Sequence, residues 1–147
     1  RLGYVIAPER ALRPLQSLMQ SFFISTSQFV QQAGVAALEH GAPHVERMRR
    51  EYALRRRMLV DGLRSMGLTI PIDPPGAFYV LVDMRHLGRD SLSLCFEILD
   101  RAHVALGPGR DFGEIAEGFV RFSFATARPQ IEEALQRLEK VLPELRD

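Results

Sequence analysis

The sequence predicts an α/β protein whose larger part is a small α+β domain, with a mixed or antiparallel sheet covered by helices. From residue 67 onward, apolar alternation and helical periodicity follow the order strand, strand, helix, strand, strand, helix. Before this region, residues 43–66 repeat apolar side chains at helical spacing over the longest such stretch in the chain. Together these observations predict a long spine helix followed by a helix-covered sheet.

Residues 1–40 predict one strand and two helices. Residues 1–7 have the β-branched and aromatic content of a strand, which Pro8 would end. Residues 11–23 and 27–38 show helical periodicity. The polar residues between these two helices form a break and a possible cap: Ser25, Thr26 and Ser27. A strand without a partner nearby in sequence is a weak start for a domain.

Arginine crowds the polar face of the predicted helix at residues 43–66. This face carries Arg47, Arg49, Arg50, Arg55, Arg56 and Arg57. One interpretation is an interaction helix that binds nucleic acid or an acidic protein. The other is a solvated face, which is the usual role of charge runs on amphipathic helices. The formal net charge of +1 gives the chain no overall field that would attract nucleic acid or an anionic membrane.

Two short strands and a helix are expected in the middle of the chain. Residues 68–72 and 77–83 have strand-like patterns. Residues 73–76, Asp-Pro-Pro-Gly, favour a turn between them, because proline fixes φ and glycine lets the chain reverse direction. Residues 91–102 place their apolar side chains on one helical face.

The last part of the chain predicts two further strands and a final helix. Residues 103–106 and 119–124 are the strands, and a glycine-rich turn lies between them. Pro129 is well placed at the start of the final helix, which carries one apolar stripe. These elements complete the predicted sheet and its cover.

Arg121 is the candidate binding residue. Strand alternation puts Phe119, Arg121 and Ser123 on one face and the apolar neighbours of Arg121 on the other. A guanidinium among large apolar side chains loses its hydration unless an anion meets it, and its fork matches a carboxylate or a phosphate. The anion could belong to a ligand, or to an Asp or Glu of the same chain. The spacing alone leaves both interpretations open.

Other patterns in the sequence argue against several classes of site. His40 and His44 have a metal-ligand spacing, but Gly41 and Pro43 between them make a continuous helical face unfavourable, so we expect no metal site. Cys95 lies among apolar residues and is expected to be a small buried hydrophobe. A single cysteine, the lack of a long apolar run and the lack of a signal peptide predict a cytoplasmic protein without membrane contact.

Several motifs together resemble one known family. They are Arg1-Leu2-Gly3-Tyr4, Gln32-Ala33 with Ala37-Leu38, Tyr52 with Arg55 and Arg56, Pro75-Gly76-Ala77-Phe78-Tyr79, Pro108-Gly109 with Phe112-Gly113, and Val120-Arg121-Phe122-Ser123. Their order and spacing resemble the C-terminal part of a pyridoxal-phosphate-dependent aminotransferase of fold type I, in the class I/II branch that includes aspartate aminotransferase. The resemblance covers essentially the whole chain.

The resemblance implies roles for individual residues. Arg121 matches the arginine that binds the α-carboxylate of the amino-acid substrate, and Arg1 matches an arginine that pairs with the phosphate of the cofactor. Ser25, Thr26 and Ser27 resemble a segment that approaches the active site of the partner subunit in the family's homodimers. Residues 1–40 would be the end of the large cofactor-binding domain. Residues 41–147 would be the interdomain helix and the small C-terminal domain, in the PLP-transferase fold.

One departure from the family concerns the reaction itself. The family transfers an amino group between an amino acid and a 2-oxo acid, and it uses a lysine that forms a Schiff base with pyridoxal 5'-phosphate. In relatives this lysine lies shortly before the stretch matching Arg1, and Lys140, expected on the helix surface, does not replace it. No catalytic residue is therefore expected in this chain. We expect the C-terminal fragment of an aminotransferase, inactive by itself.

Two alternatives remain open at the level of sequence. The first is an aminotransferase-like sensor domain of a transcription regulator, which would keep the fold but lose the reaction. The second is the arginine-rich helical interaction module described above. The sequence does not identify the amino donor, because Arg121 would read only the carboxylate that all amino acids share.

Overall fold

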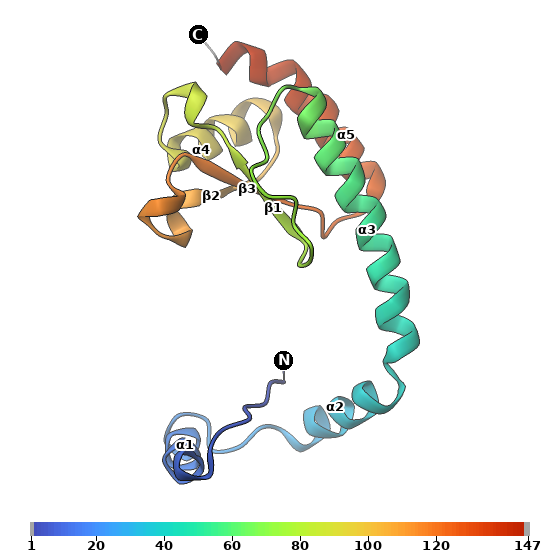
Figure 1. The fold of residues 1–147 in the computed structure, drawn as a ribbon, viewed down its shortest axis with the longest axis vertical. Helices are drawn as coiled ribbons and strands as arrows, with labels where there is room; N and C mark the ends of the chain where they lie inside the picture. Colours follow the sequence, from blue (N-terminus) through green and yellow to red (C-terminus); the bar gives the residue numbers. More distant parts are fainter. Residues whose placement is uncertain (1, 146–147) are drawn as a thin grey trace. The chain divides into compact units, whose positions relative to one another are not determined.

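The computed structural model describes residues 2–145 and divides the chain into two units, residues 1–48 and 49–147 (Figure 1). The boundary between the units lies within helix α3 (Ala42–Ser65). This helix confirms the long helix expected at residues 43–66. Among the predicted site residues, Arg1 lies outside the described part of the chain. Each unit is considered by itself below.

The first unit contains helices α1 (Glu9–Phe22) and α2 (Gln28–His40), close to the two helices expected from the sequence. The strand expected at residues 1–7 is wrong for residues 2–7, which have no regular secondary structure. A strand needs a partner for its backbone groups, and no pairing to this segment exists in the described part of the chain. No side chain of α1 or α2 is buried.

The second unit is built on a three-stranded antiparallel sheet in the order β1-β3-β2. Strand β1 (Tyr79–Asp83) pairs with β3 (Phe119–Ser123), which also pairs with the two-residue strand β2 (Gly107–Pro108). The sheet therefore takes the antiparallel form of the two that the sequence allowed. Strand β3 is the central strand, so strands β1 and β2 lie on either side of Arg121.

Three strand boundaries differ from the sequence prediction for local reasons. β1 begins at Tyr79 because Ala77 has a φ of 59°, a left-handed conformation that interrupts a strand. His103 has a φ of 55° and ends the preceding helix, so the strand expected at residues 103–106 forms only at Gly107. Residues 68–72 make a single bridge, between Thr69 and Asp83, in place of a strand.

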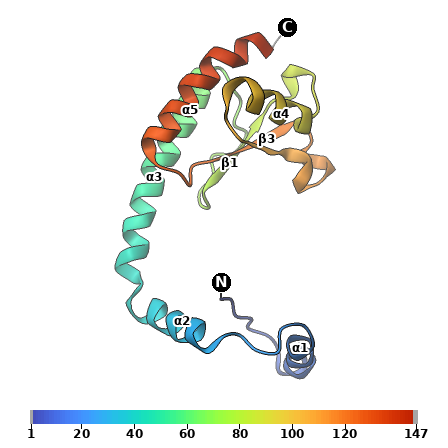
Figure 2. The ribbon, with the colours of Figure 1, turned by 180° about the vertical axis from the view of Figure 1, so that it is seen from behind.

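Helices cover one face of this sheet and enclose the core of the second unit. They are α3, α4 (Ser91–Ala102) and α5 (Arg128–Val141). Four 3₁₀ helices also occur in this unit: η1 (Arg85–Leu87) before α4, η2 (Gly109–Phe112) and η3 (Glu114–Ala116) between β2 and β3, and η4 (Leu142–Leu145) after α5. α3 and α5 lie side by side (Figures 1 and 2), and Gly62 of α3 faces Leu135 of α5 so closely that a Cβ there would meet it. Cys95 lies in this core, where burial raises the pKa of its thiol to about 11.

The N-terminus of α4 is capped by two carboxylates. Asp90 accepts a hydrogen bond from the backbone N–H of Ser93 at 3.0 Å. Glu117, which directly precedes the turn into β3, accepts one from the backbone N–H of Ser91 at 2.6 Å and another from the Ser91 hydroxyl at 3.0 Å. These hydrogen bonds hold the pKa values of Asp90 and Glu117 below their usual range. The cap therefore ties the start of α4 to the loop before Arg121.

Acid should weaken the second unit through these carboxylates. A carboxyl group whose pKa is lowered on folding adds stability above its unfolded pKa, and this stability is lost as the pH falls through the folded value. We expect the urea midpoint to fall as the pH is lowered from 7 to 3. A Glu117→Gln variant should start lower at pH 7 and lose less on acidification, whereas the exposed Glu132→Gln should follow the parent chain. Equal pH dependence in parent and Glu117→Gln would contradict the proposed contribution of Glu117.

Candidate functional site: an arginine on the open face of the sheet

Arg121 lies in the middle of β3, on the face of the sheet that the core does not cover. Its neighbours Val120 and Phe122 are buried, while Arg121 is half-buried, as the alternation in the sequence predicted. The register places Leu81 of β1 opposite Arg121 on one side and Gly107 of β2 opposite it on the other. The sheet thus presents the guanidinium between two strands that are not adjacent in sequence.

Two aromatic rings flank the guanidinium of Arg121. Its Cζ atom lies 5.6 Å from the centre of the Tyr79 ring and 5.2 Å from the centre of the Phe112 ring. Tyr79 is the first residue of β1, and Phe112 is the last residue of η2. Both distances are within the range of cation–π attraction, which stabilises a cation without neutralising it. The rings therefore hold the charge while leaving it available to an anion.

No carboxylate of residues 2–145 forms an ion pair with Arg121. Its Nε atom is buried and has no hydrogen-bond partner within this part of the chain. The internal ion pair that the sequence left open is thus not formed among the described residues. An uncompensated buried donor costs about 1–3 kcal/mol. The arrangement is suited to a ligand that brings its own negative charge.

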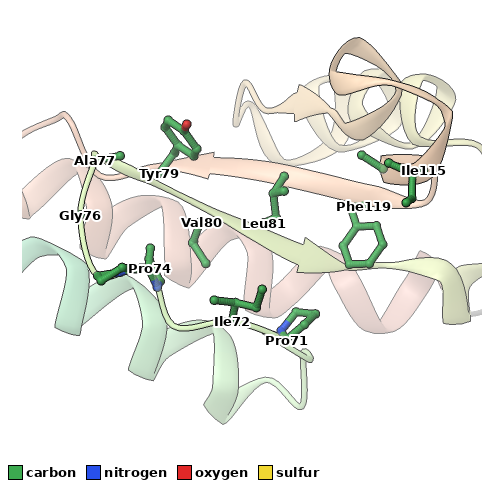
Figure 3. A pocket seen from close by; sticks show the side chains of 12 residues that line it. Pro71, Ile72, Pro74, Gly76, Ala77, Tyr79, Val80, Leu81, Ile115 and Phe119 are labelled. Carbon is green, nitrogen blue, oxygen red and sulfur yellow. The ribbon is translucent and has the colours of Figure 1, made fainter.

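An apolar pocket of about 690 Å³ adjoins the same face of the sheet. Its lining includes Pro71, Ile72, Tyr79, Leu81, Ile115 and Phe119. In Figure 3, Tyr79 and Leu81 stand on one side of β1, and Ile72 and Pro74 lie along the loop on its other side. Tyr79 both lines this pocket and contacts the guanidinium of Arg121. The pocket contains no group that could serve as an acid or a base apart from the Tyr79 hydroxyl.

A second arginine stands at the other end of the same face but is already neutralised. Arg85 donates hydrogen bonds to both carboxylate oxygens of Asp83, at 2.9 and 2.5 Å, and its Cζ lies 5.0 Å from the centre of the Phe119 ring. The hydrogen bond from Arg85 lowers the pKa of Asp83. Arg85 and Arg121 therefore both lie over aromatic rings, and of the two only Arg85 has a carboxylate partner among residues 2–145.

The remaining predicted site residues belong to the first unit. Ser25, Thr26 and Ser27 form the break between α1 and α2, and Ser27 is the N-cap residue of α2 without a side-chain capping bond. The Thr26 carbonyl accepts a hydrogen bond from Gln31 Nε2 at 2.8 Å. Their expected role at a partner's active site stays a prediction. Within residues 2–145, no group of three or more His, Cys, Asp or Glu side chains could hold a metal ion.

Sequence reasoning missed the residues that surround Arg121. Tyr79 and Phe112 stood in motifs of the family resemblance without a role, and Gly107 was seen only as part of a glycine-rich turn. Alternation along β1 places Tyr79 on the same face as Leu81, which is one signal that could have been used. The pairing register that brings these residues to Arg121 comes from the tertiary structure.

Comparisons with known proteins agree on one family. Residues 1–138 match the family model for aminotransferase class I and II. The chain is 37% identical over 145 residues to an aspartate aminotransferase of Pyrococcus horikoshii, covering 97% of this chain and 37% of that protein. It is 38% identical over 146 residues to aromatic-amino-acid aminotransferase 2 of Thermococcus litoralis, covering 98% of this chain and again 37% of the relative.

Solved structures give the same result at the level of fold. The crystal structure of an aromatic aminotransferase from Pyrococcus horikoshii matches with a TM-score of 0.89 and 37% identity, over 94% of this chain and 37% of that one. The chain therefore spans little more than a third of the length of the relatives it matches. In the part of the chain that the structure describes, no helix is both long and apolar enough to cross a membrane.

Proposed function

This chain belongs to the class I and II aminotransferases, and from that premise we propose that it is the C-terminal part of a pyridoxal-phosphate-dependent aminotransferase. The whole protein would transfer an amino group between an amino acid and a 2-oxo acid. The similarity to aminotransferases over nearly the whole chain supports the reaction class. The share of the relatives that it covers supports its being one part of a longer enzyme.

Arg121 is proposed to bind the α-carboxylate of the substrate. The observation that carries this proposal is a half-buried guanidinium that is flanked by two rings and has no internal carboxylate partner within residues 2–145. The terminal nitrogens of a guanidinium can donate two parallel hydrogen bonds to one carboxylate. Amino acids and 2-oxo acids share this carboxylate, so one arginine serves both halves of the reaction.

We propose that the described residues do not complete a cofactor site by themselves. The only lysine of the sequence, Lys140, is exposed on the last turn of α5, and it lines neither the apolar pocket nor the polar pocket beside α5. The predicted phosphate partner Arg1 lies outside the described residues. Pyridoxal 5'-phosphate, when bound to the whole enzyme, would supply the electron sink for the reaction. We propose that this chain contributes substrate binding and is not catalytic alone.

The remaining features of the proposal concern assembly. We propose a cytoplasmic homodimer in which Ser25, Thr26 and Ser27 approach the partner's active site. Residues 1–40 would end the large domain, and residues 41–147 would form the interdomain helix and the small domain. The first unit supports an assembled state, because large apolar side chains such as Phe22, Phe29 and Leu38 are exposed in it.

The arginine-rich helix offers less support for a nucleic-acid or acidic-protein partner. Arg55 forms an ion pair with Glu51 at 2.8 Å, and Glu51 is also 3.3 Å from Arg128. Arg56 donates a hydrogen bond to the carbonyl of Pro74 at 2.7 Å. These arginines are engaged within the second unit. We therefore place the function at Arg121 rather than on α3.

A reconstitution experiment tests the proposed division of labour. The 147-residue chain, mixed with pyridoxal 5'-phosphate and reduced with borohydride, should show no stoichiometric adduct by mass. The same chain, replacing the stretch that it matches in the Pyrococcus horikoshii aspartate aminotransferase, should give a protein that binds the cofactor and transfers amino groups. A stoichiometric adduct on Lys140 of the chain alone would contradict its inactivity. A folded, cofactor-loaded chimera without amino transfer would contradict the proposed function.

A further inference from the structure

We infer that Phe112, Tyr79 and Gly107 are positioning residues for Arg121. The rings of Phe112 and Tyr79 hold its guanidinium in place of hydrogen bonds, and Gly107, which has no side chain, leaves the space that the guanidinium occupies. The inference deepens the proposed carboxylate-binding role of Arg121 and rests on it. It concerns how the guanidinium is oriented before any ligand arrives.

Gly107 leaves the space in which the guanidinium lies. It is paired with Arg121 across β2 and β3, and a Cβ built on Gly107 would be 3.1 Å from Nε and 3.5 Å from Cζ of Arg121. Such a contact is closer than carbon and nitrogen normally approach, so with a side chain at residue 107 the guanidinium would have to shift by a few tenths of an ångström. Nε is buried and has no hydrogen-bond partner within residues 2–145, so no directional bond fixes this side of the guanidinium.

The two rings supply the orientation that hydrogen bonds do not. Phe112 and Tyr79 come from different elements and each lies within 6 Å of the Arg121 Cζ atom. Arg85, at the other end of the same face, is instead held by the carboxylate of Asp83. A carboxylate would occupy the same nitrogens that a substrate needs, whereas a ring face attracts the cation and leaves its N–H donors free.

Preorganisation is the expected benefit. An arginine side chain has many rotamers, and fixing it only when the ligand binds would lower the affinity. Here the rotamer is restricted beforehand by two rings and a glycine, none of which accepts a hydrogen bond from Nε. The closer ring, Phe112, belongs to the η2 segment that follows β2 directly, so Gly107 and Phe112 are positioned by one short stretch of chain.

The test uses the full 147-residue chain labelled with ¹⁵N-arginine, and pyruvate as the carboxylate probe. The Nε–Hε resonance of Arg121, identified by its loss in Arg121→Lys, should be displaced by the ring currents of its neighbours. Phe112→Leu should move it toward the position of a free arginine and weaken pyruvate binding about five- to tenfold. Phe112→Tyr, which keeps a ring, should restore both properties, and Gly107→Ala should disturb both.

The matched control is Phe96→Leu, because Phe96 is an exposed ring on α4. It should change neither the Arg121 resonance nor pyruvate affinity. An unchanged resonance and unchanged affinity in Phe112→Leu, with the thermal midpoint preserved, would overturn the positioning role. Pyruvate binding that is absent in the parent chain, or that survives in Arg121→Lys, would instead overturn the proposed function of Arg121. The two failures are therefore distinguishable.

Discussion

Replacing Arg121 with glutamine is expected to remove carboxylate binding. The variant loses two charge-assisted hydrogen bonds to the ligand, worth about 3 kcal/mol together, or roughly 100-fold in the dissociation constant. Arg121→Lys should be nearly as damaging, because an ammonium is a point charge that cannot form the same parallel pair. The measurement is the pyruvate dissociation constant of the chain, and kcat/KM for an amino acid in the chimeric enzyme.

Arg110→Gln is the control for this prediction. Arg110 lies in η2, close to the site in sequence, and its side chain is exposed, so its loss changes the net charge by the same amount. It should alter the dissociation constant no more than twofold. Equal losses in Arg110→Gln and Arg121→Gln would show that general electrostatic attraction, rather than a specific carboxylate contact, accounts for binding.

Replacing Phe124 with alanine is expected to destabilise the second unit more than any surface change. Phe124 directly follows β3, is 1% exposed, and its ring meets Tyr52 of α3 edge-on with 6.1 Å between ring centres. Truncating a buried phenylalanine costs about 3–5 kcal/mol, because apolar contact is lost and a cavity remains. Domains are stable by only about 5–15 kcal/mol, so this loss is a large share of the free energy of unfolding. Urea unfolding measures the change.

Phe96→Ala removes the same atoms from an exposed ring of α4. It should change the free energy of unfolding by no more than about 0.5 kcal/mol. A loss in Phe124→Ala that is no larger than in Phe96→Ala would mean that Phe124 is not packed as the structure shows. The sheet face opposite Arg121 would then not be fixed by the core.

The sequence predicted elements well where one period ran without interruption. The long apolar repeat of α3 and the alternation of β3 both correspond to observed elements. It failed where a single residue changes the backbone direction, as His103 and Ala77 do with positive φ. Neither residue is a glycine, so composition gave no warning of a left-handed conformation there.

The sequence likewise predicted one part of the candidate site and not the rest. Arg121 could be found from the sequence because alternation alone places a cation among apolar side chains on one strand. Its surroundings could not, because Gly107, Phe112 and Tyr79 meet it through strand register and loop geometry. The sequence also could not show whether Arg121 forms an ion pair with an Asp or Glu of its own chain, because that depends on the positions of the carboxylates in the folded structure. The family resemblance implied that Arg121 binds a carboxylate, but it did not indicate which residues surround Arg121.

A crystal structure of the chain with bound pyruvate would show directly whether Arg121 binds a carboxylate. We predict that both carboxylate oxygens lie within hydrogen-bond distance of the terminal nitrogens of Arg121, with its guanidinium still between Tyr79 and Phe112. A carboxylate bound elsewhere, with Arg121 turned to an Asp or Glu of its own chain, would contradict the proposed role of Arg121.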